Sequence, residues 1–180
     1  IFKALKRRET FATSGPRIAP RFFAGWELSK TTCNETNLAG EGYRNGVPMG
    51  SVLPASPNES AKPRFVVSAN ADVGTSNNPG HPLQRLQIIK GWVNADGHFE
   101  QSVVDVAGDA NNGAGVDTST CAAYGEGFAT LCGVWEDSDF NADQDAVYYA
   151  RVIENPSCRW STRMCLGFDK ESRPDACNNA

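Results

Sequence analysis

The chain is 180 residues long, which is enough for one domain with a buried core, or for one domain and part of another. It carries 17 Lys and Arg against 21 Asp and Glu, a net charge of −4, and so lacks the basic surface that sequence-independent nucleic-acid binding requires. No apolar run approaches the roughly 20 residues of a membrane-spanning helix, and no signal peptide is visible. We therefore expect no nucleic-acid partner and no membrane span.

The first nine residues, IFKALKRRE, predict the end of an amphipathic helix with Ile1, Phe2 and Leu5 on its apolar face. Because the sequence starts inside this pattern, we expect a truncated or processed chain whose export signal lies upstream. Residues 10–13, TFAT, predict a short strand that the following Ser-Gly-Pro ends.

A second strand is expected at residues 21–28, followed by a long loop at residues 29–63 that is rich in Gly, Asn, Pro and Ser. The pattern then becomes that of β-structure over residues 64–153, where apolar residues recur at alternate positions. Residues 94–97, Asn-Ala-Asp-Gly, predict the turn of a hairpin. Several short strands separated by turns indicate an antiparallel β-sandwich, with helix largely confined to residues 1–9.

Several long runs of the chain resemble one known family, the domain of unknown function 3604. They are ALKRRETFATSGPRI, RFFAGW, GVPMG, PLQRLQIIKGWV, LCGVWEDSDF and YYARVIENPSCRWS, and together they cover nearly the whole chain. The beginning also resembles metallohydrolases of the polymerase-and-histidinol-phosphatase (PHP) superfamily, including the CehA/McbA-like group.

This resemblance implies a mainly β chain. Residues 1–53 would be the last helix and strand of a PHP-like α/β barrel with a connecting loop. Residues 54–180 would be an immunoglobulin-like antiparallel β-sandwich with a disulfide-bearing C-terminal tail. Such barrels hold divalent metals with His, Asp and Glu motifs, none of which maps onto this sequence. The resemblance therefore implies that the metal centre and the catalytic residues lie in an upstream barrel portion of the same protein, which would be the partner of this chain.

Ser14 and Arg17 are the candidate substrate-binding residues. If residues 10–13 form a barrel strand, the loop after it lies at the face where barrel enzymes keep their active sites. The planar guanidinium of Arg17 suits an anionic substrate group. The alternative is that Gly15-Pro16 only turns the chain and that Arg17 pairs with a nearby carboxylate. The glycine-rich loop at residues 42–50, GYRNGVPMG, has the same two interpretations: close approach to a ligand, or a plain connection.

A calcium site is the second hypothesis. Oxygen-bearing side chains occupy alternate positions and could converge on one hard cation: Asp137, Asp139, Asn141, Asp143 and Asp145. However, Ala142 and Tyr148 stand where an EF-hand has its Gly and its bidentate Glu, so a solvated acidic loop is the alternative. No transition-metal site is expected, because there is no Cys-x-x-Cys pair and because His81 and His98 lie far from other ligands.

The six cysteines predict disulfides in an oxidising compartment, so we expect an extracellular or periplasmic location. Closing short loops costs little entropy, which favours Cys158–Cys165 and Cys121–Cys132 and leaves Cys33–Cys177 as the third pair. The expected function is that of an accessory β-domain of a secreted PHP-like metal-dependent hydrolase, unlikely to be active alone and without a cofactor of its own. The alternative is a non-enzymatic secreted β-sandwich that binds proteins or has a structural role.

Overall fold

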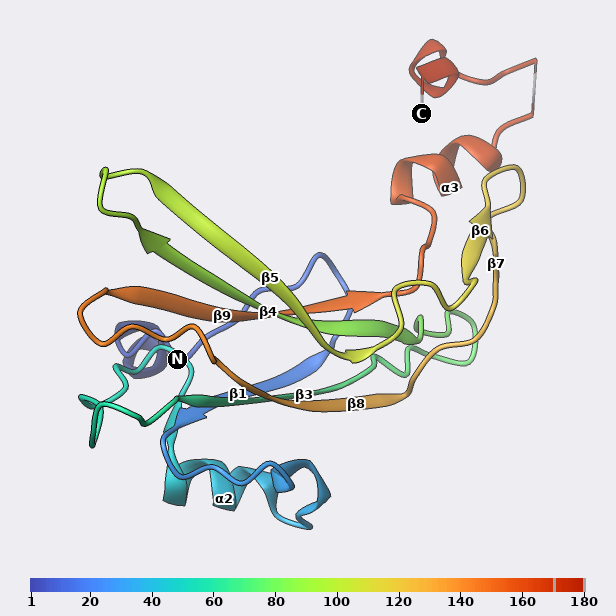
Figure 1. Ribbon diagram of the computed structural model, residues 1–180. Coiled ribbons are helices and arrows are strands. Elements are labelled where there is room, and N and C mark those ends of the chain that lie inside the picture. Colours follow the sequence, from blue (N-terminus) through green and yellow to red (C-terminus); the bar gives the residue numbers. More distant parts are fainter. Residues whose placement is uncertain (170, 180) are drawn as a thin grey trace.

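The computed structural model describes residues 1–169 and 171–179. The protein is mainly antiparallel β-structure with few helices, and its strands form three sheets, ordered β2-β1-β3-β8, β5-β4-β9 and β6-β7 (Figure 1). The strands are β1 (Ala19–Gly25), β2 (Val47–Pro48), β3 (Arg64–Asn70), β4 (Leu83–Val93), β5 (Phe99–Gly108), β6 (Gly115–Asp117), β7 (Ala122–Tyr124), β8 (Thr130–Glu136) and β9 (Ala146–Glu154). The helices are α1 (Phe2–Lys6), α2 (Leu38–Asn45) and α3 (Trp160–Leu166), with 3-10 turns η1 (Thr32–Asn34) and η2 (Asp175–Asn179).

The four-stranded sheet joins the two parts of the sequence that the expected boundary near residue 54 would separate. β1 pairs with β3 along its whole length, with Phe22 opposite Val67, and β3 pairs in turn with β8. The boundary therefore falls between two neighbouring strands of one sheet. Residues 10–13 form no strand, although a strand was expected there.

The three-stranded sheet contains the predicted hairpin. β4 and β5 pair from Val93↔Phe99 onward, and their turn is the Asn94–Gly97 sequence that the pattern singled out. The Asn94 carboxamide oxygen accepts hydrogen bonds from the backbone N–H groups of Asp96 and His98, and Gly97 has a φ of +80°, which glycine adopts without strain.

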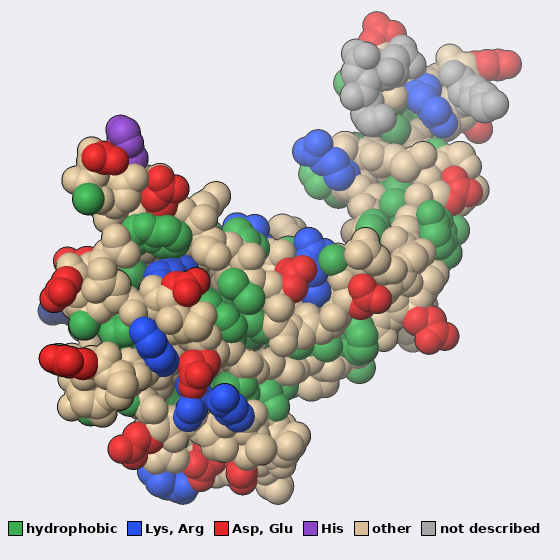
Figure 2. Space-filling view, in the orientation of Figure 1, with side chains coloured by type: hydrophobic (Ala, Val, Ile, Leu, Met, Phe, Trp, Pro, Cys, Tyr) green, Lys and Arg blue, Asp and Glu red, His purple; other side chains and the backbone are tan. Residues whose placement is uncertain are grey.

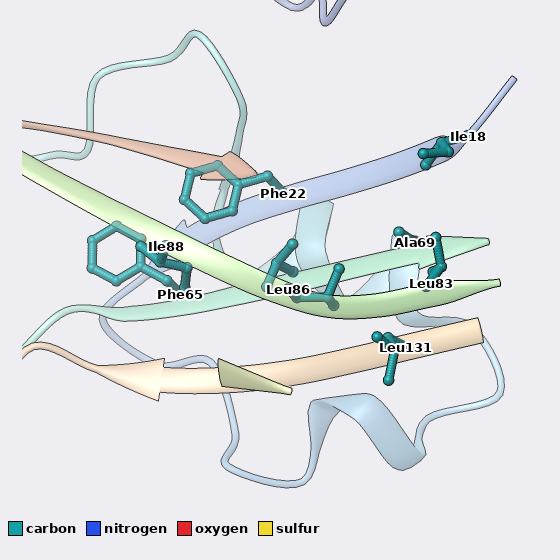
Figure 3. Packing of buried hydrophobic residues seen from close by; sticks show 9 residues of the cluster. Ile18, Phe22, Phe65, Ala69, Leu83, Leu86, Ile88 and Leu131 are labelled. Carbon is teal, nitrogen blue, oxygen red and sulfur yellow. The ribbon is translucent and has the colours of Figure 1, made fainter. Parts of the chain in front are cut away.

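One core lies between the two larger sheets, which pack against each other face to face (Figure 3). The members on β3, and Leu86 and Ile88 on β4, occupy alternate positions, as the period of two predicts. The core consists of Phe22, Phe65, Val67, Ala69, Leu83, Leu86, Ile88 and Leu131, together with Ile18 just before β1. Tyr148, Ala150 and Val152 of β9 pack against the same cluster. These three residues therefore share one face of β9.

A smaller core covers the opposite face of the four-stranded sheet, where α2 lies in Figure 1. The side chains of Phe23 and Val66 point to this face, because their chain neighbours point to the main core. The α2 helix was not predicted. It begins at Asn37, whose side chain accepts a 2.9 Å hydrogen bond from the backbone N–H of Gly40. The expectation that helix is largely confined to residues 1–9 was thus wrong for α2 and also for α3.

All three predicted disulfide pairings were wrong. The structure pairs Cys33 with Cys132, Cys121 with Cys158, and Cys165 with Cys177. The prediction counted only the entropy of closing short loops, whereas sheet pairing had already brought distant residues together. Cys132 on β8 faces the smaller core beside Cys33, so the two meet across 99 residues of sequence with a Cα–Cα distance of 5.7 Å.

The α3 helix and the small β6-β7 sheet project from one end of the two-sheet body (Figure 1). The Cys121–Cys158 disulfide links the turn between β6 and β7 to the chain just before α3. Among the described residues, no helix has the length and apolar character needed to cross a bilayer.

Candidate functional site

The N-terminal segment carries large apolar side chains that the two-sheet body does not bury. Phe2 and Leu5 of α1 are 77% and 57% exposed, and Ile1, Phe11 and Tyr43 are exposed as well. We call these five residues the N-terminal surface. A monomeric soluble domain normally leaves such residues scattered, and a group of them indicates a contact surface.

Polar contacts hold this segment against the body. Nε of Arg8 donates a 3.0 Å hydrogen bond to the carbonyl oxygen of Gly50, and the hydroxyl of Tyr43 donates one of 3.0 Å to Glu9. Hydrogen bonds from Arg7 and Tyr43 lower the pKa of the Glu9 carboxyl, while the bond to Glu9 raises the pKa of Tyr43. The segment is therefore anchored by its polar groups and presents its apolar groups to solvent.

The predicted substrate-binding residues follow the anchored segment in the sequence. Ser14 and Arg17 are both exposed, and the backbone N–H of Arg17 donates a 2.7 Å hydrogen bond to Oδ2 of Asp72. Backbone hydrogen bonds from Arg17 and Gly74 lower the pKa of the Asp72 carboxyl. It is thus the backbone of Arg17 that contacts this carboxylate.

The glycine-rich loop at residues 42–50 comes close to the N-terminal segment. A cavity of about 160 Å³ separates them, and its lining includes Glu9, Phe11, Tyr43 and Met49. Gly50 has a φ of +82°, and a Cβ there would lie 2.3 Å from the carbonyl oxygen of Arg8. This glycine is thus needed for close approach of the two backbones, in addition to joining α2 to β3.

A buried polar cluster at the edge of the main core was not predicted. Nζ of Lys90 donates a 2.6 Å hydrogen bond to Oδ2 of Asp137, and the Tyr148 hydroxyl donates another of 2.6 Å to the same oxygen. Lys90 also reaches the carbonyl oxygen of Asp139 and lies 5.5 Å from the ring centroid of Trp92. The sequence contains one indication of this cluster. Lys90 follows Leu86 and Ile88 at the same spacing of two residues, so its side chain is expected on the inward face of β4.

The structure does not gather the five residues of the calcium hypothesis around one point. Asp137 is buried and turned toward the Lys90 ammonium, while Asp139, Asp143 and Asp145 lie on the loop outside it. The side-chain oxygen of Asn141 accepts a hydrogen bond from the backbone of Asp143. Within residues 1–169 and 171–179, no three His, Cys, Asp or Glu side chains are grouped as metal ligands.

A larger pocket, of about 540 Å³, lies where the C-terminal projection meets the body. Its lining includes His81, Arg163 and the Cys121–Cys158 disulfide. The sequence indicated only that His81 lies far from other metal ligands, and nothing in the spacing of the chain connects it with Arg163.

A family model described as "Protein of unknown function (DUF3604)" matches residues 1–180. The chain belongs to the DUF3604 family. The resemblance read from the sequence runs is therefore confirmed at the level of this family, over the full length of the chain. No curated protein and no solved structure matches this DUF3604 chain.

Proposed function

We propose that this DUF3604 chain is the accessory β-domain of an exported, PHP-like metal-dependent hydrolase, and that it braces a catalytic barrel belonging to the same protein. In this proposal the two packed sheets form an immunoglobulin-like sandwich, and the metal ions are held by the barrel. Ser14 and Arg17 would lie near the barrel's active site. Phosphate, sulfate and amide esters are the substrate classes considered.

The N-terminal surface is the observation that carries the proposal. Each of its five side chains is more than half exposed, whereas the Arg8–Gly50 and Tyr43–Glu9 hydrogen bonds fix the segment in place. An anchored, exposed apolar surface suits a rigid contact with a neighbouring domain. Burying Phe2 and Leu5 there would stabilise the contact by about 1.5–3 kcal/mol for each side chain.

The three disulfides support the exported location. Every cysteine in the described part of the chain is paired, and such bonds persist in oxidising compartments. They join a segment covering the four-stranded sheet to β8, the β6-β7 turn to the chain before α3, and the end of the projection to α3.

A footprinting comparison tests the proposal. The 180-residue chain and the longest reading frame that contains it would be oxidised with hydroxyl radicals, and modification would be read at Phe2, Leu5 and Phe11. We expect these residues to be several-fold less modified in the longer protein. Val103, on the outer face of the three-stranded sheet, is the internal control, because the proposed contact does not cover it. Equal modification of the N-terminal surface in both proteins would contradict the bracing role.

Activity provides the second readout. The longer protein would be assayed on phosphate, sulfate and amide esters before and after removal of divalent metal. We expect metal-dependent hydrolysis that the double variant Phe2→Asp/Leu5→Asp weakens, while the matched variant Val103→Asp leaves it unchanged. Melting curves of the 180-residue versions would show that neither variant unfolds the β-domain.

A non-enzymatic binding module is the second candidate function, and one observation favours it. Phe99, Val103, Val147 and Tyr149 form an exposed apolar row on the outer face of the three-stranded sheet, because the register places them on the side opposite the core. If the footprint of the longer protein protected this row and not the N-terminal surface, the binding module would be the better description.

A further inference from the structure

The pocket at the base of the C-terminal projection has the chemistry of an anion site. It measures about 540 Å³, which lies within the range of pockets that hold small organic ligands. Its polar lining comes from Asn77, Asn78, His81 and Arg163, and none of its lining residues is acidic. A guanidinium, an imidazole and two carboxamides supply hydrogen-bond donors, so they favour a ligand with acceptor oxygens and negative charge.

These four side chains have no competing partners. Across residues 1–169 and 171–179, no ion pair involves Arg163 and no side-chain hydrogen bond is made by His81, Asn77 or Asn78. Arg64 differs in this respect, because it makes a 2.7 Å ion pair with Glu136. The donors at the pocket are therefore available to a ligand.

Both walls of the pocket are held in place. One wall is a tight loop closed by the bridge between Gly74 and Pro79 and by the 2.8 Å hydrogen bond from the backbone N–H of Thr75 to the carbonyl oxygen of Asn78. The other wall includes α3, which the Cys121–Cys158 disulfide ties to the turn after β6. Figure 2 shows the projection standing out from the body, and the disulfide fixes α3 to the β6-β7 part of this projection.

The rest of the lining is apolar. Pro79, Pro82 and Ala123 line the pocket beside the disulfide, and Pro82 leads directly into β4. A bare inorganic ion would fill a small part of this volume and would leave the apolar wall uncovered. A ring-sized body next to the charged group would use both kinds of surface.

We propose that the pocket between the loop at residues 77–82 and Arg163 binds a small organic anion, in which a carboxylate or phosphate ester is carried on a sugar-sized body. Arg163 holds the charged group through its planar fork, His81 and the two asparagines donate further hydrogen bonds, and the proline wall contacts the body. This site is independent of the barrel contact proposed above, because it lies on the C-terminal projection and requires no residue of the N-terminal surface.

Calorimetric titration of the oxidised 180-residue chain tests the site with four probes. Glucuronate and glucose 6-phosphate carry the two anionic groups on the same body, glucose is the uncharged control, and inorganic phosphate is the small-ion control. We expect at least one of the charged sugars to bind about ten-fold more tightly than glucose, since a charge-assisted hydrogen bond supplies the difference. The tighter of the two identifies the anionic group.

Two pairs of variants give the controls. Arg163→Gln should remove the ten-fold advantage, whereas Arg159→Gln should keep it, because Arg159 begins the same helix without lining the pocket. Cys121→Ser/Cys158→Ser should also remove it, while Cys165→Ser/Cys177→Ser should not. The proposal is overturned if glucose binds as tightly as the charged sugars, if Arg163→Gln binds them unchanged, or if inorganic phosphate alone binds as tightly as they do.

Discussion

Lys90 and Asp137 form a buried ion pair, with 2.6 Å between Nζ and Oδ2 and with side chains only 8% and 2% exposed. Lys90 belongs to β4 of the three-stranded sheet, and Asp137 follows β8 of the four-stranded sheet. The pair therefore links the two sheets at the end of the main core. Tyr148 completes the cluster, and its ring stacks on Phe65 with 4.2 Å between ring centroids.

The first prediction concerns the loss of one partner of this pair. Asp137→Ala leaves a buried ammonium without its counter-charge, so we expect the free energy of unfolding to fall by about 3–5 kcal/mol. Urea denaturation of the oxidised chain measures it. The exposed pair of Arg44 and Glu41 is the matched control, and Arg44→Gln there should cost less than about 1 kcal/mol. Similar costs at both sites would contradict the structural role of the buried pair.

The second prediction is that stability decreases at high pH through Tyr148. Burial, and then the hydrogen bond to Asp137, raise the pKa of Tyr148 well above its ordinary value. Unfolded tyrosine ionises near pH ~10, so above that pH the folded chain retains a proton that the unfolded chain loses. The contribution is complete below pH ~10 and decreases as pH rises, by up to about 1.4 kcal/mol per pH unit.

Tyr148→Phe provides the test of that effect. The variant lacks the titrating hydroxyl, so its free energy of unfolding should decrease less steeply above pH 10 than that of the unmodified chain. Tyr124→Phe is the control, because Tyr124 is 59% exposed on β7 and should not change the slope. Parallel curves for Tyr148→Phe and the unmodified chain would remove Tyr148 as the cause.

Strand positions could be predicted from the sequence because burial alternates along each strand. The period of two predicted β-structure over residues 64–153, which contain β3, β4, β8 and β9, and the Asn94–Gly97 turn located the hairpin. The same alternation placed Leu131 in the core and therefore Cys132 on the opposite face, which was the available clue to its pairing with Cys33. The prediction chose cysteine pairs by the low entropy cost of closing short loops. In the folded chain, however, the pairing of strands decides which cysteines lie close together.

The α2 helix and the polar sites were harder to predict for different reasons. The α2 segment contains Gly40 and Gly42, which disfavour helix, and it forms because Asn37 caps it and the smaller core lies beneath it. The pocket residues His81 and Arg163 are far apart in sequence, and only the folded chain places both of them at one pocket. No spacing rule connects such groups.

The third prediction tests the packing of α2. A Cβ on Gly42 would lie 2.5 Å from the ring of Phe23, so Gly42→Ala forces the helix away from the sheet. We expect a loss of about 1–3 kcal/mol in the free energy of unfolding, even though alanine favours helix more than glycine does. Gly167→Ala is the control, because the nearest atom there is 3.3 Å away and the backbone is right-handed. If Gly42→Ala stabilised the chain, the close packing of α2 on the Phe23 ring would be contradicted.

The last prediction ranks the three disulfides by their effect on stability. Cys33–Cys132, Cys121–Cys158 and Cys165–Cys177 span 99, 37 and 12 residues. In the chain-entropy model, replacing each pair by serines should cost about 5, about 4 and about 3 kcal/mol, because longer loops restrict the unfolded chain more. Peptide mapping without reduction would first verify the pairs, and urea denaturation of each double variant would then give the order.

The positions of the disulfides relative to the two cores should widen the difference between the first and the last of them. Cys132 packs on the smaller core beside Val134, whereas Cys165 and Cys177 lie in the C-terminal projection, apart from both cores. Loss of Cys165–Cys177 should therefore lower the stability of the two-sheet body by less than the ~3 kcal/mol of the chain-entropy model, while loss of Cys33–Cys132 should lower it by the full amount. If removing the tail disulfide destabilised the body as much as removing Cys33–Cys132 did, the projection would be an integral part of the folded core.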